Sequence, residues 1–255
     1  MGTLTDWLAD CVYLDTETTG LDDDDIALEV GVVDRDGREL FQSYIKPDDP
    51  SFFDQREGLN ETAWRSDYEL EEAEEYGEEI EPSFKYARGY AERIHGIKKE
   101  VVMSEGRYMH EIQGELEEVL RGKNVVIYNA DFDIRIMSQT GFSIMKNSRR
   151  IFCAMLAYSD YSNKRRWNDY YKNWKWRKLK DAYHECGGTK LQTHRAVTDC
   201  QMTHLVWNTI IHRIGINITP VEFLSLGEFL RNVSFKHNFW KPDVIKYDSM
   251  SEAPF

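Results

Sequence analysis

The alternation of apolar and polar residues predicts a β-sheet near the start of the chain. Residues 11–18 (CVYLDTET) are rich in β-forming residues and predict a strand. Residues 29–45 predict a hairpin, because the segments EVGVVD and RELFQSYI flank the turn-forming pair Asp36-Gly37. Further along, the apolar run VVIYNA at residues 125–130 is typical of a strand that is buried on both faces.

Apolar residues at helical spacing alternate with strands in the second half of the chain. In residues 111–121, for example, Ile112 and Leu116 lie one helical turn apart and Gly122 ends the pattern. The other helices are expected at residues 132–139, 177–186 and 195–213. Strands followed by alternating helices and strands predict an α/β fold with a mixed sheet flanked by helices.

The chain length bears on the domain organisation. A length of 255 residues suits one catalytic domain with additions. We expect this domain at residues 1–215, with an acidic insertion at about residues 48–92 and a C-terminal extension at residues 216–255. The insertion is rich in glutamate and has little apolar periodicity, which favours a solvated segment. A nucleic-acid mimic or a surface for a protein partner is the alternative.

Two carboxylates stand close together on the first predicted strand. Side chains alternate across a strand, so Asp15 and Glu17 project from the same face. Neighbouring carboxylates repel one another, and a divalent cation is the usual compensation. The turn Thr18-Thr19-Gly20 follows directly, at the end of the strand where α/β sheets carry their sites.

Further candidate ligands come from two later segments. Asp133 follows the buried strand, and its neighbour Asp131 is a competing candidate that also suits the N-cap of the next helix. His194 and Asp199 lie at the start of the longest predicted helix, about 140° apart around its axis. Because they cannot share one face of a regular helix, we expect His194 on the lip ahead of the helix, over a metal held by Asp199. A surface histidine with a capping partner is the alternative for this pair.

Together these segments resemble the motifs of the DEDDh, or DnaQ-like, exonuclease family. The motifs are DTETTGL at residues 15–21, YNADFD at residues 128–133 and HRAVTDC at residues 194–200, with IHGI at residues 94–97 similar to a segment that precedes the second motif in many members. The resemblance covers residues 11–210 apart from the acidic insertion. HRAVTDC and Cys153-Ala154-Met155 are most similar to the exonuclease X-like branch.

The resemblance implies an RNase H-like fold and a 3′→5′ exonuclease that releases 5′-mononucleotides, with single-stranded DNA ends preferred. The catalytic set that it implies is Asp15, Glu17, Asp133, His194 and Asp199. The four carboxylates would hold two Mg²⁺ or Mn²⁺ ions, with Asp15 bridging both, because oxygen ligands favour these hard cations over zinc. His194 would be the general base, since the ordinary histidine pKa of about 6.5 suits a base at neutral pH.

The same resemblance implies four contacts with the terminal nucleotide. Thr18 would contact it through its backbone, Leu21 would wedge against the last base, and His95 and Phe132 would line the pocket. For Leu21 and Phe132, ordinary core packing is the alternative.

The net charge of −13 conceals a strong polarity along the chain. Residues 48–81 contain 14 acidic and 2 basic residues, whereas residues 146–180 contain 11 basic residues, 2 acidic residues and eight aromatic residues. Basic side chains bind phosphates, and aromatic rings stack on unpaired bases. We therefore expect this basic–aromatic segment, residues 146–180, to bind nucleic acid, unless its aromatic residues are core and its cations merely solvated. The candidate contacts are Arg165, Arg166, Trp167, Lys172 and Lys175.

The motifs do not separate the substrates and partners that this chemistry could serve. An RNA-trimming exoribonuclease of the oligoribonuclease or RNase T kind would carry the same carboxylates, and a proofreading subunit would bind a polymerase through residues 216–255. A non-catalytic binding module is disfavoured because all five catalytic positions are intact. No run approaches the about 18 apolar residues of a membrane span, and four scattered cysteines suit a reducing cytosol. We therefore expect a cytoplasmic protein without membrane contact.

Overall fold

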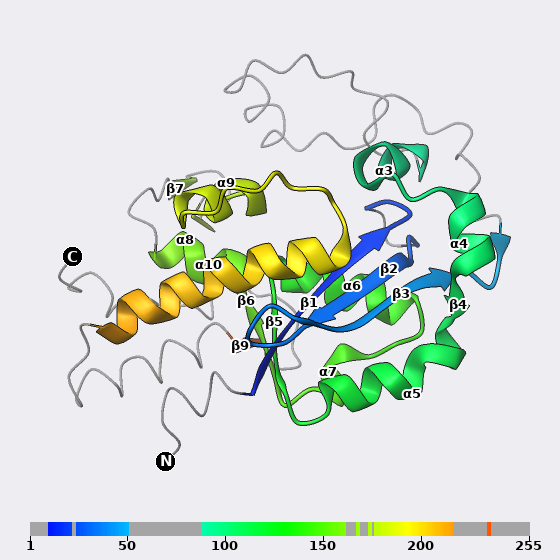
Figure 1. The fold of residues 1–255 in the computed structure, drawn as a ribbon, viewed down its shortest axis with the longest axis horizontal. Helices are drawn as coiled ribbons and strands as arrows, with labels where there is room; N and C mark the ends of the chain where they lie inside the picture. Colours follow the sequence, from blue (N-terminus) through cyan, green and yellow to red (C-terminus); the bar gives the residue numbers. More distant parts are fainter. Residues whose placement is uncertain are drawn as a thin grey trace.

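A mixed β-sheet forms the centre of the molecule (Figure 1). The computed structural model describes residues 10–21, 24–50, 88–161, 167–168, 173–174, 176–216 and 234–235. Within these residues the sheet has the order β4-β3-β2-β1-β5-β6-β9. Its strands are β1 (Cys11–Thr18), β2 (Ala27–Val33), β3 (Glu39–Lys46), β4 (Arg107–Tyr108), β5 (Asn124–Ile127), β6 (Arg150–Cys153) and β9 (Ser234–Phe235). Strand β1 is antiparallel to β2 and parallel to β5, which confirms the expected mixed sheet.

The central strands are buried because helices cover both faces of the sheet. The helices are α3 (Arg88–His95), α4 (Lys99–Glu105), α5 (Met109–Leu120), α6 (Ala130–Gln139), α7 (Ile144–Asn147), α8 (Ala154–Tyr161), α9 (Leu179–Glu185) and α10 (Ala196–Ile216). Helix α10 crosses one face, where the Tyr13 hydroxyl of β1 donates to Oδ1 of Asn208 at 3.2 Å. Helix α6 packs on the other face, where the Thr16 hydroxyl donates to Asp133.

The expected elements are found with small differences in their bounds. The predicted hairpin forms, with Gly37 in the left-handed conformation at φ 76° that the turn requires. Helix α6 begins at Ala130, two residues before the predicted start, and Asn129 is its N-cap. The prediction of Asp131 as the N-cap was therefore wrong, because the earlier start places Asp131 inside the first turn, where its side chain is exposed.

Several sequence features lie wholly or partly outside the described residues. Most of the acidic insertion, residues 51–87, is among them, as is most of the C-terminal extension. Within that extension, β9 pairs antiparallel with β6, with Phe235 opposite Ile151. The four cysteines all lie in the described part of the chain and form no disulfide bond there, and Cys11, Cys153 and Cys200 are buried. Among the described helices, none has the length and apolar character needed to cross a membrane.

Candidate active site

Strand β1 continues past the end of β5, and this overhang carries the first two carboxylates. The last described pair between the strands joins Tyr13 to Val126, so Asp15 and Glu17 lie beyond it. Alternation along β1 directs both carboxylates to the face of Tyr13, which α10 covers. The first pair of candidate ligands therefore faces the beginning of α10.

The neighbouring strand β2 lets α10 begin directly over these carboxylates. Gly31 lies opposite Asp15 in the β1–β2 register. A Cβ at Gly31 would lie 2.7 Å from the amide nitrogen of Val197 and 2.8 Å from the carbonyl carbon of Ala196. Glycine is therefore required for the close approach of the sheet to the first turn of α10.

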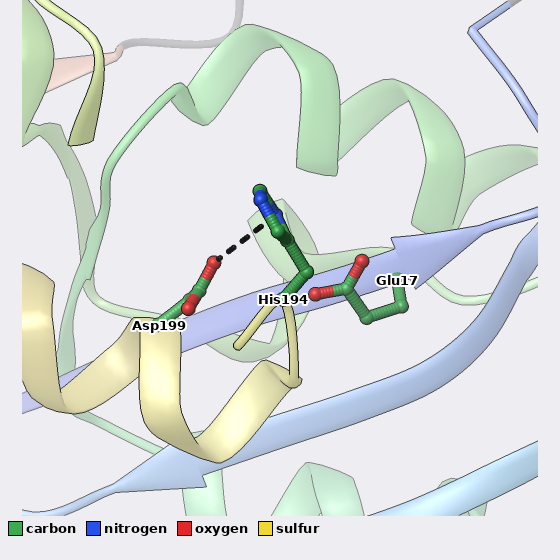
Figure 2. Close-up of side chains that lie close together, drawn as sticks. All are labelled: Glu17, His194 and Asp199. Carbon is green, nitrogen blue, oxygen red and sulfur yellow. Dashed lines mark ion pairs between the residues drawn. The ribbon is translucent and has the colours of Figure 1, made fainter. Parts of the chain in front are cut away.

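Three candidate ligands from β1 and α10 meet at this point (Figure 2). The ligand atoms of Glu17, His194 and Asp199 all lie within 4.8 Å of one another. Nδ1 of His194 lies 4.0 Å from Oδ2 of Asp199. His194 precedes α10 and has φ 49°, which a non-glycine residue rarely adopts. Its side chain is 41% exposed, whereas the Asp199 side chain, in the first turn of α10, is 6% exposed.

Asp133 lies in the first turn of α6 and is hydrogen-bonded to β1. Its partner on β1, Thr16, lies beyond the last residue that pairs with β5. The Thr16 hydroxyl donates to Oδ1 of Asp133 at 2.8 Å, and the Thr16 backbone amide also bonds this carboxylate. Asp133 is 4% exposed, in contrast to the exposed Asp131. Of the two competing aspartates, the structure thus brings Asp133 to the cluster. Sequence reasoning missed Thr16, whose position on the opposite face of β1 from Asp15 and Glu17 gave no hint of this contact.

Burial and the charges of neighbouring carboxylates raise the pKa of the four acidic residues of the carboxylate cluster, Asp15, Glu17, Asp133 and Asp199. Burial, followed by the charges of Asp133, Asp199 and Glu17, raises the pKa of Asp15. Burial and then the charge of Asp199 raise the pKa of Glu17 to about 9. Burial also raises the pKa of Asp133 to about 7, although the hydrogen bonds from Thr16 act to lower it. Burial raises the pKa of Asp199 to about 6, although the hydrogen bond from Gln192 acts to lower it.

One unpartnered oxygen fits the view that a cation belongs in this cluster. Oδ2 of Asp199 accepts a hydrogen bond from Gln192, whereas the buried Oδ1 has no hydrogen-bond partner among the described residues. A buried carboxylate oxygen without a partner is costly. A divalent cation would satisfy Oδ1 and would offset the repulsion between the carboxylates. The residues present therefore fit a site for hard divalent metal ions.

The surroundings of His194 lower the pKa of its imidazole, which favours the neutral form. Burial lowers its pKa first, and the nearby ammonium of Lys180 in α9 lowers it further. A neutral imidazole is the form that accepts a proton. The arrangement can thus place a proton acceptor beside a cation held by Glu17 and Asp199.

Arg195, the residue after His194, forms an ion pair with the buried Glu29, and sequence reasoning missed it. Glu29 of β2 is 0% exposed and accepts hydrogen bonds from Arg195 at 2.8 and 3.1 Å. Burial raises the pKa of Glu29, but the bonds from Arg195, Ala196 and Gln42 outweigh burial, and the net pKa is lowered. The available signal was a charged residue in the middle of the otherwise apolar strand ALEVGVV.

The residues expected to contact the terminal nucleotide form two linked pairs. Nδ1 of His95 accepts from the Ile97 amide, so Nε2 carries the proton and donates to the Thr18 carbonyl at 3.1 Å. Both ring nitrogens of His95 are thus used inside the protein, and they hold the turn at Thr18.

Arg135 links the second pair, Leu21 and Phe132. Its guanidinium donates to the Leu21 carbonyl at 2.9 Å and lies 5.4 Å from the centre of the Phe132 ring. The Leu21 side chain is 52% exposed and so is not part of the core, whereas Phe132 packs partly against the core. Arg135 was not among the residues expected at the site.

Most of the candidate contacts in the basic–aromatic segment lie outside the described residues. These are Arg165, Arg166, Lys172 and Lys175. Trp167 belongs to a short hairpin of β7 (Trp167–Asn168) and β8 (Asn173–Trp174), in which it lies opposite Trp174. The binding role of this segment stays a prediction.

Comparison with known proteins decides the family. The RNase T exonuclease family model matches residues 83–206, which include Asp133, His194 and Asp199. The uncharacterized exonuclease CP81 of Escherichia phage 186 is 31% identical over 208 residues, which are 77% of this chain and 86% of that protein. The chain belongs to the DnaQ-like exonuclease family. This membership confirms the expected class of enzyme, a nucleic-acid hydrolase.

Two further similarities extend the comparison. A segment of 42 residues of this exonuclease is 52% identical to the uncharacterized protein pSLT049 of Salmonella typhimurium, over 16% of this chain and 30% of that protein. Escherichia coli exonuclease I, solved with a dT13 oligonucleotide, superimposes with a TM-score of 0.53 at 14% identity, covering 85% of this chain. This chain spans 43% of exonuclease I. The superposition confirms the RNase H-like fold.

Proposed function

We propose that this exonuclease removes 5′-mononucleotides from 3′ ends with the help of two Mg²⁺ or Mn²⁺ ions, and that it prefers single-stranded DNA. One observation carries the proposal: the ligand atoms of Glu17, His194 and Asp199 lie within 4.8 Å of one another. The charges of Asp15 and Asp133 act on this group, as the raised carboxyl pKa values indicate. Bound cations would offset the charge of the ionised carboxylates and so favour the approach of an anionic substrate.

The metal ions would be held by the four carboxylates, Asp15, Glu17, Asp133 and Asp199. When bound, such ions lower the pKa of a water molecule and neutralise negative charge on the oxygen that leaves. The Thr16 and Gln192 side chains each bond one oxygen of Asp133 and Asp199, respectively. These bonds orient both carboxylates, and the bond from Gln192 leaves Oδ1 of Asp199 for ligation.

His194 would take the proton from the attacking water. The oxygen of this water forms a bond to the terminal phosphorus while the bond from phosphorus to the 3′-oxygen of the preceding nucleotide breaks. The leaving 3′-oxygen takes a proton from solvent water and His194 releases its proton to solvent, so the products are a 5′-mononucleotide and a chain with a new 3′-hydroxyl. Neutral His194 suits this step, because burial and Lys180 keep its pKa low.

The residues beside the cluster support recognition of a chain end. Leu21 is exposed at the end of β1, a few residues beyond Glu17, and Arg135 fixes the Leu21 backbone. An exposed leucine here can pack against the terminal base, and the Arg135 guanidinium lies 5.4 Å from the centre of the Phe132 ring. The basic–aromatic segment, residues 146–180, would bind the rest of the strand through phosphates and unpaired bases. Ring stacking requires unpaired bases, which is why we favour single strands.

End-labelled oligonucleotides test the proposal. A 5′-labelled single-stranded DNA should shorten from its 3′ end in Mg²⁺ or Mn²⁺ and stay intact in EDTA. Asp199→Asn and His194→Ala proteins should lose this activity. Parallel digestions of duplex DNA and RNA determine the substrate class, and faster digestion of RNA would replace DNA in the proposal. Shortening from the 5′ end, or equal rates in EDTA, would contradict it.

A further inference from the structure

We infer that the ion pair of Glu29, which is buried, and Arg195, which is partly exposed, is a positioning device for the general base His194. The inference rests on the proposed function, because it assigns a role in the same reaction. Arg195 follows His194 directly in the chain. Anything that fixes the Arg195 side chain therefore also limits the positions open to the His194 backbone.

Glu29 binds both Arg195 and the first residue of α10, and so fixes the start of this helix. Nε of Arg195 lies 3.1 Å from Oε2 of Glu29, and Nη2 lies 2.8 Å from Oε1. The backbone amide of Ala196, the first residue of α10, also donates to Oε2 of Glu29 at 3.1 Å. A single buried carboxylate thus binds both the side chain that follows His194 and the first amide of the helix.

Tyr44 of β3 also contacts the Arg195 guanidinium, through both its hydroxyl and its ring. Nη2 of Arg195 donates to the Tyr44 hydroxyl at 2.6 Å, and the guanidinium carbon lies 5.4 Å from the centre of the Tyr44 ring. The planar guanidinium is therefore held at its edge by Glu29 and against the ring of Tyr44. A lysine could keep the charge at this position but could not reproduce this geometry.

The bonding of Glu29 excludes it as a metal ligand, although it lies opposite Glu17 in the sheet. Oε1 accepts from Gln42 and Arg195, and Oε2 accepts from Arg195 and Ala196. Both oxygens are thus occupied, in contrast to the unpartnered Oδ1 of Asp199. Glu17 and Glu29 share a face and a neighbourhood, but only Glu17 has ligand atoms near those of His194 and Asp199.

The unusual backbone conformation of His194 requires contacts that hold this residue in place. Its φ of 49° is an unfavourable conformation for a residue with a side chain, and such conformations persist only where the surrounding structure enforces them. In the described structure, the bonds to the residues directly after His194 supply this constraint. A shift of the imidazole by about 1 Å can lower the rate about 100-fold.

A double-mutant cycle tests the inference, with Arg195→Lys as the main variant. Single-stranded DNA hydrolysis is measured at saturating Mg²⁺ for the wild type, Arg195→Lys, His194→Ala and the double variant. We expect Arg195→Lys to lower kcat by about 100-fold, with KM and Mn²⁺ affinity unchanged. In the His194→Ala background the same change should have no further effect on kcat, because no base is left to position.

Tyr44→Phe is the second variant, since it removes one hydroxyl and keeps both Glu29 and Arg195. It should lower kcat less than Arg195→Lys and by a factor that also disappears in the His194→Ala background. An equal fold-loss in both backgrounds, or weakened Mn²⁺ binding by Arg195→Lys, would overturn the inference and indicate a purely structural pair. A wild-type protein without metal-dependent hydrolysis would overturn the proposed function instead.

Discussion

Nδ1 of His194 lies 4.0 Å from Oδ2 of Asp199, which is longer than a hydrogen bond. The pair is close enough for electrostatic attraction when His194 is protonated, and Glu17 lies beside it, with its ligand atom within 4.8 Å of theirs (Figure 2). This separation suits a division of labour, in which Asp199 binds a cation and His194 accepts a proton beside it.

The first prediction separates these two roles. His194→Ala should lower kcat by about 10²- to 10⁴-fold, the usual range for loss of a general base, and should leave Mn²⁺ affinity close to that of the wild type. Asp199→Asn should weaken Mn²⁺ binding as well as activity. Activity assays and Mn²⁺ titrations of both proteins check this, and a large loss of Mn²⁺ affinity in His194→Ala would make His194 a ligand.

The second prediction concerns stability and pH in the absence of metal. The carboxyl pKa values in the folded protein are raised, to about 6 for Asp199, about 7 for Asp133 and about 9 for Glu17, so the folded state binds these protons more tightly than the unfolded state. This contribution to stability is complete below about pH 4, the range of unfolded carboxyl groups, and is lost as pH rises through 6 to 9. In EDTA the melting temperature should therefore fall over this range.

Mg²⁺ should reverse that fall, and the increase in melting temperature should grow with pH. Asp133→Asn removes one of the titrating groups and should flatten the pH dependence in EDTA. Thermal unfolding at several pH values, with EDTA or Mg²⁺, gives both results. An identical Mg²⁺ effect at pH 6 and pH 9 would count against the cation site.

The third prediction concerns Lys180. Burial and then the Lys180 ammonium lower the pKa of His194, so Lys180→Gln should raise that pKa. The acidic limb of the profile of kcat/KM against pH should then move to higher pH at saturating Mg²⁺. Lys190→Gln is the matched control, because Lys190 is also exposed but does not contribute to the His194 pKa. Equal profiles for the wild type and Lys180→Gln would refute this electrostatic link.

The fourth prediction concerns the packing of α10 on the sheet. Gly31→Ala places a methyl group 2.7 Å from the Val197 amide nitrogen, so β2 and α10 must move apart. We expect a loss of about 1–3 kcal/mol in the free energy of unfolding, typical of overpacking. Gly114→Ala in α5 is the control: nothing lies within 4 Å of its added Cβ, and it should stabilise the protein slightly. Urea denaturation of both variants measures the difference.

The fifth prediction concerns the basic–aromatic segment. Reversing the charges of Arg165 and Arg166 to glutamate should weaken binding to single-stranded DNA and reduce the dependence of affinity on salt. The control reverses Arg35 and Arg38, which flank the β2–β3 turn and pair with Asp36. Equal affinities for the wild type and the Arg165–Arg166 variant would exclude these two residues as phosphate contacts.

Local sequence patterns predicted four of the eight described helices, α5, α6, α9 and α10, and four strands of the main sheet, β1, β2, β3 and β5. The hairpin turn at Asp36-Gly37, the strand that carries Asp15 and the long helix after His194 each follow from local periodicity and turn residues. The error at Asp131 arose because two aspartates and an asparagine compete for the start of one helix. Sequence alone does not show which of them lies at the boundary.

The contacts behind the site could not be predicted in this way, because they join distant parts of the chain. Glu29 and Arg195 are 166 positions apart, and Thr16 and Asp133 are 117 positions apart. A buried glutamate in an apolar strand signals that a partner exists, but only the packing of α10 on β2 identifies Arg195. The motifs thus identified Glu17, His194 and Asp199, which the structure brings together, whereas the residues that orient them required the structure.

Direct titration with Mn²⁺ tests the central claim, that carboxylates from three distant segments form a divalent metal site. The wild-type chain should bind two ions, and a variant with amides in place of Asp15, Glu17, Asp133 and Asp199 should bind neither. Asp131→Asn, which removes an exposed carboxylate next to the site, should bind both. Equal Mn²⁺ binding by the wild type and the four-fold variant would contradict the account.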